Sequence, residues 1–201
     1  MSKLTPHLRA CLLALGLLFG WTSASPATAG EVGEQVLGDP QAPVTMVEFA
    51  SLTCPHCASF HTDTLPALKE RYIDTGKVKL VMRDFPLDQL ALAASVIAHC
   101  AGPDRYFAFI EAMFANQQSW ARAADPVQAL LQLAQVGGLA QDQARACLDD
   151  KSMADAVLQM RLDAQEQYDI KSTPSFVIDG TLYAGNRSVE EFGEIIEEAT
   201  P

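Results

Sequence analysis

The 201-residue chain is short of positive charge, with 14 Lys and Arg residues against 25 Asp and Glu and a formal net charge of −11. This excess of acid disfavours binding to nucleic acid or to an anionic membrane surface. Beyond its N-terminal region the chain lacks an apolar run long enough to span a bilayer, and it lacks internal repeats and low-complexity tracts. We therefore expect a soluble protein with no nucleic-acid partner, folded as one domain that is large enough to carry an insertion.

The first 29 residues have the composition of a signal peptide. Lys3 and Arg9 give a positively charged start, and residues 10–21 form an apolar segment too short to cross a membrane. Residues 27–29 match a small-x-small cleavage site. We expect cleavage there and export of the protein, with a retained N-terminal anchor as the alternative. Cleavage would remove two basic residues and no acid, leaving 12 basic residues against 25 acidic ones, a net charge of −13.

Cysteine is scarce, and one of the five cysteines lies within the predicted signal peptide. The other four are Cys54, Cys57, Cys100 and Cys147. An even number in an exported protein favours paired thiols, and four cysteines allow three pairings. A ring between Cys54 and Cys57 would leave Cys100 to pair with Cys147. The alternative for these last two is a pair of buried free thiols.

The motif Cys54-Pro55-His56-Cys57 lies where a strand changes into a helix. Residues 44–50 form a short, mostly apolar run typical of a strand, and Pro55 suits the first helical position. Unpaired N–H groups and the positive end of the helix dipole stabilise a thiolate at Cys54. His56 can add a positive charge or donate a hydrogen bond to the sulfur. The motif therefore predicts redox chemistry.

A zinc half-site is the alternative interpretation of this motif, with His61 one helical turn after Cys57 as a further ligand. The chain offers no second Cys pair nearby, and an exported protein favours a disulfide. We therefore prefer the redox interpretation, and we predict that His61 is a solvated helix residue rather than a catalytic one.

The apolar pattern places the motif in a β-α-β unit. Residues 30–43 are expected to be an extended lead-in, followed by the strand at 44–50, a helix from 55 to about 75 and a second strand at 77–83. The crossover is long enough for the two strands to be parallel.

Residues 87–150 are alanine-rich and follow a helical period, which predicts a helical module inserted into the β-α-β frame. A longer helix is expected at 152–168. Strands at 175–178 and 181–184 are joined by Asp179-Gly180, a strong signal for a hairpin. These patterns divide the chain into a signal peptide, a first part of an α/β fold, a helical insertion and a second part of that fold, with bounds 1–29, 30–86, 87–150 and 151–201.

Further features around the motif lead to a resemblance. They are Gly38-Asp39-Pro40, Glu48-Phe49, Arg83-Asp84-Phe85-Pro86-Leu87, and Thr173-Pro174 before the Phe-containing strand. With Cys-Pro-His-Cys and an export signal, they resemble the DsbA-like thiol:disulfide oxidoreductases of the thioredoxin superfamily over about residues 40–199. The resemblance implies an α/β thioredoxin fold, a central mixed sheet flanked by helices, with an inserted all-helical subdomain.

The resemblance also implies roles for individual residues. Pro174 is expected to be a cis-proline that lies against the active-site disulfide. Glu48 is expected to be a buried acid that transfers protons or tunes a pKa. Thr173 departs from better-known DsbA proteins, which carry Val before this proline. The predicted catalytic residues are Cys54, Pro55, His56, Cys57, Glu48, Thr173 and Pro174.

The predicted function is the introduction of disulfide bonds into reduced or unfolded exported proteins. A substrate thiolate attacks Cys54 in the Cys54–Cys57 disulfide, and a second substrate thiolate resolves the mixed disulfide. By resemblance, the enzyme is a periplasmic monomer that a DsbB-like quinone-linked membrane protein reoxidises, and it needs neither metal nor organic cofactor. The first alternative is a disulfide isomerase or reductase, which usually has a dimerisation domain that residues 30–43 are too short to form. The second is a non-enzymatic chaperone or binding module.

Overall fold

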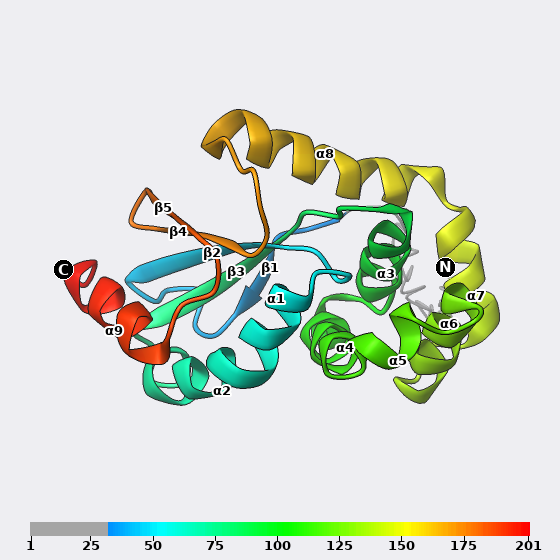
Figure 1. The fold of residues 1–201 in the computed structure, drawn as a ribbon, viewed down its shortest axis with the longest axis horizontal. Coiled ribbons are helices and arrows are strands. Elements are labelled where there is room, and N and C mark those ends of the chain that lie inside the picture. Colours follow the sequence, from blue (N-terminus) through cyan, green and yellow to red (C-terminus); the bar gives the residue numbers. More distant parts are fainter. Residues whose placement is uncertain (1–31) are drawn as a thin grey trace, which may run out of the picture.

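The computed structural model describes residues 32–201 as a five-stranded sheet covered by helices, with further helices gathered at one end (Figure 1). The predicted signal peptide lies outside the described residues. The strand order is β1-β3-β2-β4-β5. Strands β2 and β3 are parallel and all other neighbours are antiparallel, so the predicted mixed sheet is confirmed. The strands are Gln35–Leu37, Val44–Ala50, Val78–Asp84, Ser175–Ile178 and Thr181–Ala184.

The lead-in contains a strand that the sequence analysis missed. Strand β1 pairs antiparallel with β3, and Val36 lies opposite Val81. It has only three residues, which is too short to show the alternation of polar and apolar side chains that reveals a strand. The lead-in therefore forms one edge of the sheet.

The helix after the motif covers one face of the sheet together with α9, Val189–Glu198 (Figure 1). It is continuous but alternates between α and π geometry, and Leu65 N–H donates to the carbonyl of Phe60, five residues earlier. Packing on this face centres on Phe176, whose ring lies 4.7 Å from Phe60 and 4.8 Å from Phe192 between centroids. The segments are α1, Pro55–Ser59; a π turn, Phe60–Thr64; α2, Leu65–Leu68; and a second π turn, Lys69–Ile73.

Helix α8, Lys151–Tyr168, lies across the other side of the molecule and bridges its two parts (Figure 1). Near its end, Ala164 packs with Phe49 and Phe85 against the sheet. Near its start, Met153 and Val157 pack against the first helix of the insertion. A single helix thus holds the sheet and the helical module together.

The predicted helical module consists of five helices: α3, Gln89–Cys100; α4, Pro103–Ala115; α5, Gln117–Ala121; α6, Pro126–Val136; and α7, Gln141–Asp149. Asp88 caps α3 by accepting a hydrogen bond from Ala91 N–H, and Asp125 caps α6 in the same way through Gln128 N–H. The module encloses a core of its own that reaches the active-site loop. Among the described residues, no helix combines the length and apolar character needed to cross a membrane.

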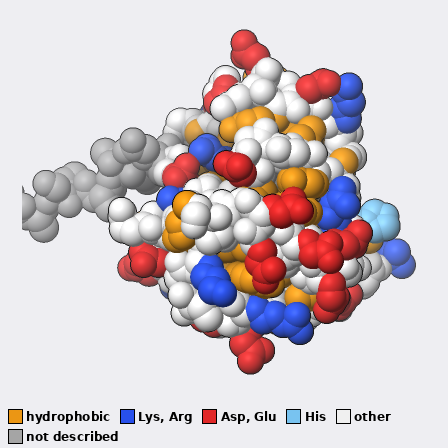
Figure 2. Space-filling model, turned by 90° about the vertical axis from the view of Figure 1, so that its left-hand side faces the viewer, with side chains coloured by type: hydrophobic (Ala, Val, Ile, Leu, Met, Phe, Trp, Pro, Cys, Tyr) orange, Lys and Arg blue, Asp and Glu red, His pale blue; other side chains and the backbone are white. Residues whose placement is uncertain are grey.

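The face formed by α9 and the β4–β5 hairpin carries acidic side chains with basic ones between them (Figure 2). Two ion pairs at the surface are loose, with Arg71 3.8 Å from Glu190 and the half-buried Arg187 3.9 Å from Glu191. Exposed pairs of this kind contribute about 0–1 kcal/mol each. We infer that this face remains solvated and that stability comes from the buried clusters.

Cys100 at the end of α3 and Cys147 in α7 form a disulfide, with their Cα atoms 6.2 Å apart and 47 residues of separation. Closing such a loop stabilises a protein by roughly 4 kcal/mol in the chain-entropy model.

We predict that changing both cysteines to Ala lowers the melting temperature by about 10 °C. Calorimetry under non-reducing conditions measures the shift, and the reactivity of Cys54 should stay unchanged. Two free thiols at these positions in peptide maps of the oxidised wild type would contradict the prediction.

Candidate active site

The Cys-Pro-His-Cys motif follows the central strand β2 and starts helix α1. Cys54 occupies the N-cap position with extended backbone angles, φ −79° and ψ 119°, and Pro55 enters the first turn as predicted. The backbone N–H of Cys54 donates to the carbonyl of Ser51 at 3.0 Å. This turn points the Cys54 sulfur along the start of the helix, beside its free N–H groups.

The surroundings of Cys54 stabilise its thiolate. The pKa of Cys54 falls from an ordinary value of 9.0 to about 5, chiefly because the Cys57 thiol donates a hydrogen bond to the sulfur. Burial opposes this change, since the side chain is 7 % exposed, but Thr173 and the backbone N–H groups of Cys57 and His56 add further hydrogen bonds. Cys54 is therefore a thiolate at neutral pH.

The pKa of Cys57 is shifted in the opposite direction from that of Cys54. It is fully buried, and burial raises the pKa of its thiol far above the ordinary range. The hydrogen bond to Cys54 and the negative charge of Glu48 raise this pKa further. In this structure both cysteines are free thiols, so the chain is in the reduced form. Two adjacent groups with pKa values driven apart can take separate acid–base roles.

Thr173 and Pro174 lie beside the motif, joined by a cis peptide bond. The Cys54 sulfur lies 3.3 Å from the carbonyl oxygen of Thr173, to which it can donate only when protonated. The Thr173 hydroxyl is buried and has no other partner among the described residues, so its proton is available for the hydrogen bond that helps to lower the pKa of Cys54. His56 is exposed, and its backbone N–H rather than its ring contacts the Cys54 sulfur.

Glu48 is completely buried in β2, and its partner is His61. The Nε2 atom of His61 lies 3.2 Å from one carboxylate oxygen of Glu48 and 3.1 Å from the other. The prediction that His61 is solvated is therefore wrong, because its side chain is only 1 % exposed. The sequence contained a usable signal, since His61 follows Cys57 by one helical turn on the face that the helix buries.

Among residues 32–201, no group of three or more His, Cys, Asp or Glu side chains is placed to hold a metal ion.

Gln117 is a site residue that the sequence analysis missed. It begins α5 in the insertion and is 3 % exposed. Its side-chain amide donates to the carbonyl of Leu52 at 2.9 Å and to that of Cys54 at 3.0 Å. These bonds satisfy two buried carbonyls of the active-site loop and fix the loop to the helical module.

A second buried network fixes the insertion to the end of β3. The carboxylate of Asp84 lies 2.7 Å from Nε2 of His99 and accepts hydrogen bonds from Tyr106 and Ser95. Despite burial, the hydrogen bonds and the charge of His99 lower the pKa of Asp84. Burial and the charge of Asp84 raise the pKa of the Tyr106 phenol. Asp84 thus connects helices α3 and α4 to the sheet.

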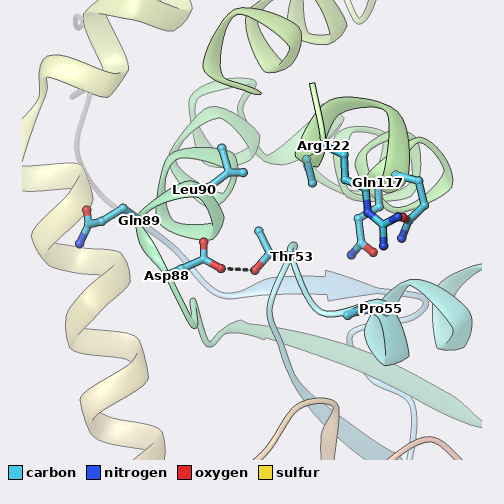
Figure 3. A pocket seen from close by; sticks show the side chains of 9 residues that line it. Thr53, Pro55, Asp88, Gln89, Leu90, Gln117 and Arg122 are labelled. Atoms are coloured by element: carbon cyan, nitrogen blue, oxygen red, sulfur yellow. Dashed lines mark hydrogen bonds between the residues drawn. The ribbon is translucent and has the colours of Figure 1, made fainter. Parts of the chain in front are cut away.

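An open cavity of about 470 Å³ lies directly beside the motif (Figure 3). Thr53 and Pro55, which flank Cys54, form one part of its lining. The start of α3 and helix α5 form the rest, and Thr53 donates a 2.7 Å hydrogen bond to Asp88. Most of the lining side chains from the insertion are amides or aliphatic groups, and Arg122 adds an exposed guanidinium. The lining residues from the insertion are Asp88, Gln89, Leu90, Gln117, Gln118, Ala121 and Arg122.

The chain has similar sequences among known proteins. A family model described as thioredoxin matches residues 31–198. A Rickettsia conorii protein whose name calls it a protein-disulfide oxidoreductase is 33 % identical over 168 residues, which are 83 % of this chain and 60 % of that protein. Disulfide bond formation protein D of Bacillus subtilis is 29 % identical over 177 residues, 83 % of this chain and 77 % of that protein. The chain thus spans about 60 % of the length of its rickettsial relatives.

Solved structures resemble the chain over a similar range. Wolbachia pipientis alpha-DsbA1 has a TM-score of 0.78 and 33 % identity, covering 84 % of this chain and 92 % of that one. BdbD from Bacillus subtilis has a TM-score of 0.74 and 25 % identity, covering 83 % and 92 %. The matches in sequence and structure, together with the paired thiols at the start of α1, show that this chain belongs to the thioredoxin superfamily, among the DsbA-like thiol:disulfide oxidoreductases.

Proposed function

We propose that this protein oxidises pairs of thiols in reduced, exported polypeptides by passing them its own Cys54–Cys57 disulfide. The main support for this proposal is that the pKa values of the two thiols are shifted in opposite directions. Cys54 has a pKa of about 5, whereas burial keeps the pKa of Cys57 far above its ordinary range. A stabilised thiolate is a good leaving group, and stabilising the reduced form makes the disulfide a stronger oxidant.

In the proposed cycle, a substrate thiolate attacks the Cys54 sulfur of the disulfide. The Cys54–Cys57 bond breaks, its electron pair goes to Cys57, and Cys57 takes up a proton. A second substrate thiolate then attacks the substrate sulfur of the mixed disulfide and displaces Cys54 as a thiolate. Two electrons pass from substrate to enzyme, one proton stays on Cys57, and the other goes to solvent.

The cavity beside the motif suits a polypeptide that carries the reacting cysteine. Its amide side chains, Gln89 and Gln118, can hydrogen-bond to the backbone of an extended segment whatever its sequence. A DsbB-like quinone-linked membrane protein would then reoxidise the reduced enzyme in the periplasm, where a monomer is sufficient for the whole cycle.

Reductase activity would use the same residues with the electron flow reversed, and isomerase activity would use them with no net electron flow. The low pKa of Cys54 favours oxidation of the substrate, because it makes the reduced enzyme the stable product. A non-enzymatic binding module would not need two thiols with opposed pKa values. We therefore favour the oxidase.

The first test is oxidation of a reduced two-thiol peptide by the oxidised protein, compared with reduction of insulin. We expect rapid peptide oxidation and weak insulin reduction. Cys54→Ser should abolish both activities, since it removes the sulfur that the substrate attacks. Cys57→Ser cannot form the Cys54–Cys57 disulfide, so it should not oxidise the peptide, but its Cys54 thiolate should attack an insulin disulfide and give an enzyme–insulin mixed disulfide that persists on non-reducing gels. Peptide oxidation by Cys54→Ser at the wild-type rate would rule out the proposed function.

A second prediction concerns how the helix start lowers the pKa of Cys54. His56→Pro removes the backbone N–H that contacts the sulfur, whereas His56→Ala keeps it and removes only the ring. A hydrogen bond to a charged group is worth about 1.5–3 kcal/mol, so His56→Pro should raise this pKa by about one pH unit or more. Thiolate absorbance followed against pH measures it in both variants. A larger effect from His56→Ala would assign the role to the imidazole ring instead.

A further inference from the structure

The buried thiol of Cys57 has to gain and lose a proton during each cycle, although it has no contact with solvent. Its side chain is fully buried, and so is the carboxylate of Glu48 that acts on it. A proton that reaches Glu48 must therefore continue through another group. Only one described side chain lies within hydrogen-bond distance of this carboxylate, and it is His61.

The imidazole ring of His61 is held in a fixed position. It stacks on Phe114 of helix α4, with ring centroids 4.2 Å apart and an interplanar angle of 27°. Nε2 faces both oxygens of Glu48, at 3.2 and 3.1 Å. The other ring nitrogen, Nδ1, is buried and has no hydrogen-bond partner among the described residues. Nε2 therefore faces Glu48, and Nδ1 is left without a hydrogen-bond partner among the described residues.

A surface cavity reaches His61 from outside. It has a volume of about 490 Å³, and His61 lines it together with residues of the helix after the motif and of α4: Thr62, Leu65, Pro66, Lys69, Glu111 and Ala115. This cavity has no residue in common with the one beside Cys54. The two cavities are therefore lined by different residues.

We propose that His61 is a positioning residue that carries protons between the buried Cys57–Glu48 pair and solvent in this cavity. The proposal rests on the proposed thiol–disulfide exchange and adds the route by which Cys57 changes its protonation. A general acid or base must lie within hydrogen-bond reach of the group it serves, and His61 meets this condition for Glu48.

The proton step balances over one cycle. When Cys57 attacks a mixed disulfide on Cys54, the thiol proton moves to a Glu48 oxygen, and the S–H electron pair forms the new S–S bond. The leaving thiolate departs with the old bonding pair. Glu48 passes the proton on to Nε2 of His61 while Nδ1 releases a proton to water in the cavity, so the carboxylate is restored and the ring stays neutral. When Cys57 later leaves the disulfide as a thiolate, Nε2 returns a proton through Glu48 to the sulfur, and Nδ1 takes one from the cavity.

Other titratable groups around this route come from two elements, α4 and the second π turn. Tyr106 and Glu111 lie on α4, and the charge of Glu48 contributes to the raised pKa of the Tyr106 phenol. Lys69 lines the cavity from the second π turn, where it also forms an exposed pair with Asp74. The Tyr106 phenol keeps its proton, and Lys69 and Glu111 line the side of the route that is open to solvent.

The reaction of the reduced enzyme with oxidised glutathione allows the step performed by Cys54 and the step performed by Cys57 to be measured separately. Attack by Cys54 forms a glutathione mixed disulfide, and attack by Cys57 then resolves it. His61→Gln can still donate a hydrogen bond to Glu48 but cannot carry a proton. We expect unchanged formation and a resolution rate slower by about 10²-fold, the lower end of general acid–base effects. Acid-quenched samples analysed by mass spectrometry measure both steps.

Chemical rescue provides a second readout. His61→Ala leaves space next to the cavity, and added imidazole should restore its resolution rate but have no effect on His61→Gln. The matched control is His99→Gln, which alters the other buried His–carboxylate pair, His99 with Asp84, and should leave the ratio of the resolution rate to the formation rate unchanged.

The possible outcomes are distinguishable. Wild-type resolution rates in both His61 variants, or no rescue by imidazole, would overturn the role of His61. Equal slowing of formation and resolution would indicate a structural role only and would overturn it too. If the wild-type protein itself forms no mixed disulfide, the proposed function fails rather than the role of His61.

Discussion

The stabilisation of a negative charge on the Cys54 sulfur is the interaction on which the rest of the site depends. It is a local effect of a helix start, where backbone N–H groups of His56 and Cys57 have no partner within the helix. The Cys57 thiol contributes the largest share by donating its own proton to the same sulfur. A group that donates must remain protonated, so the thiolate at Cys54 and the thiol at Cys57 support each other.

The helical insertion contributes to this arrangement from three directions. Gln117 holds the carbonyls of Leu52 and Cys54, which fixes the loop that presents the sulfur. Phe114 stacks on His61 and fixes the ring that faces Glu48. Asp84 connects α3 and α4 to the end of β3. The insertion therefore supports the site in addition to covering it.

Local signals in the sequence were sufficient for much of this structure. Pro55 after Cys54 and the Asp179-Gly180 turn each depend on neighbouring residues, and the structure has both where they were predicted. Features that depend on distant contacts were missed. Gln117 is 63 residues from Cys54 along the chain, and nothing near it indicates a buried amide. The spacing of His61 from Cys57 indicates its buried position, but its contacts with Glu48 and Phe114 follow only from the folded arrangement.

The central claim is tested most directly by the stability of the reduced and oxidised forms as a function of pH. Cys54 titrates at about 5 in the folded reduced protein and near 9.0 when unperturbed, so its contribution is complete above pH 9 and is lost as pH falls through 5. Below pH 9, Cys57 stays protonated in both the folded and the unfolded reduced protein and does not change this slope. The oxidised form lacks the thiolate, and the other titrating groups are common to both forms. We predict that the unfolding free energy of the reduced form exceeds that of the oxidised form at pH 7 and that the excess shrinks steadily towards pH 5. A difference that does not vary with pH over this range would contradict the account.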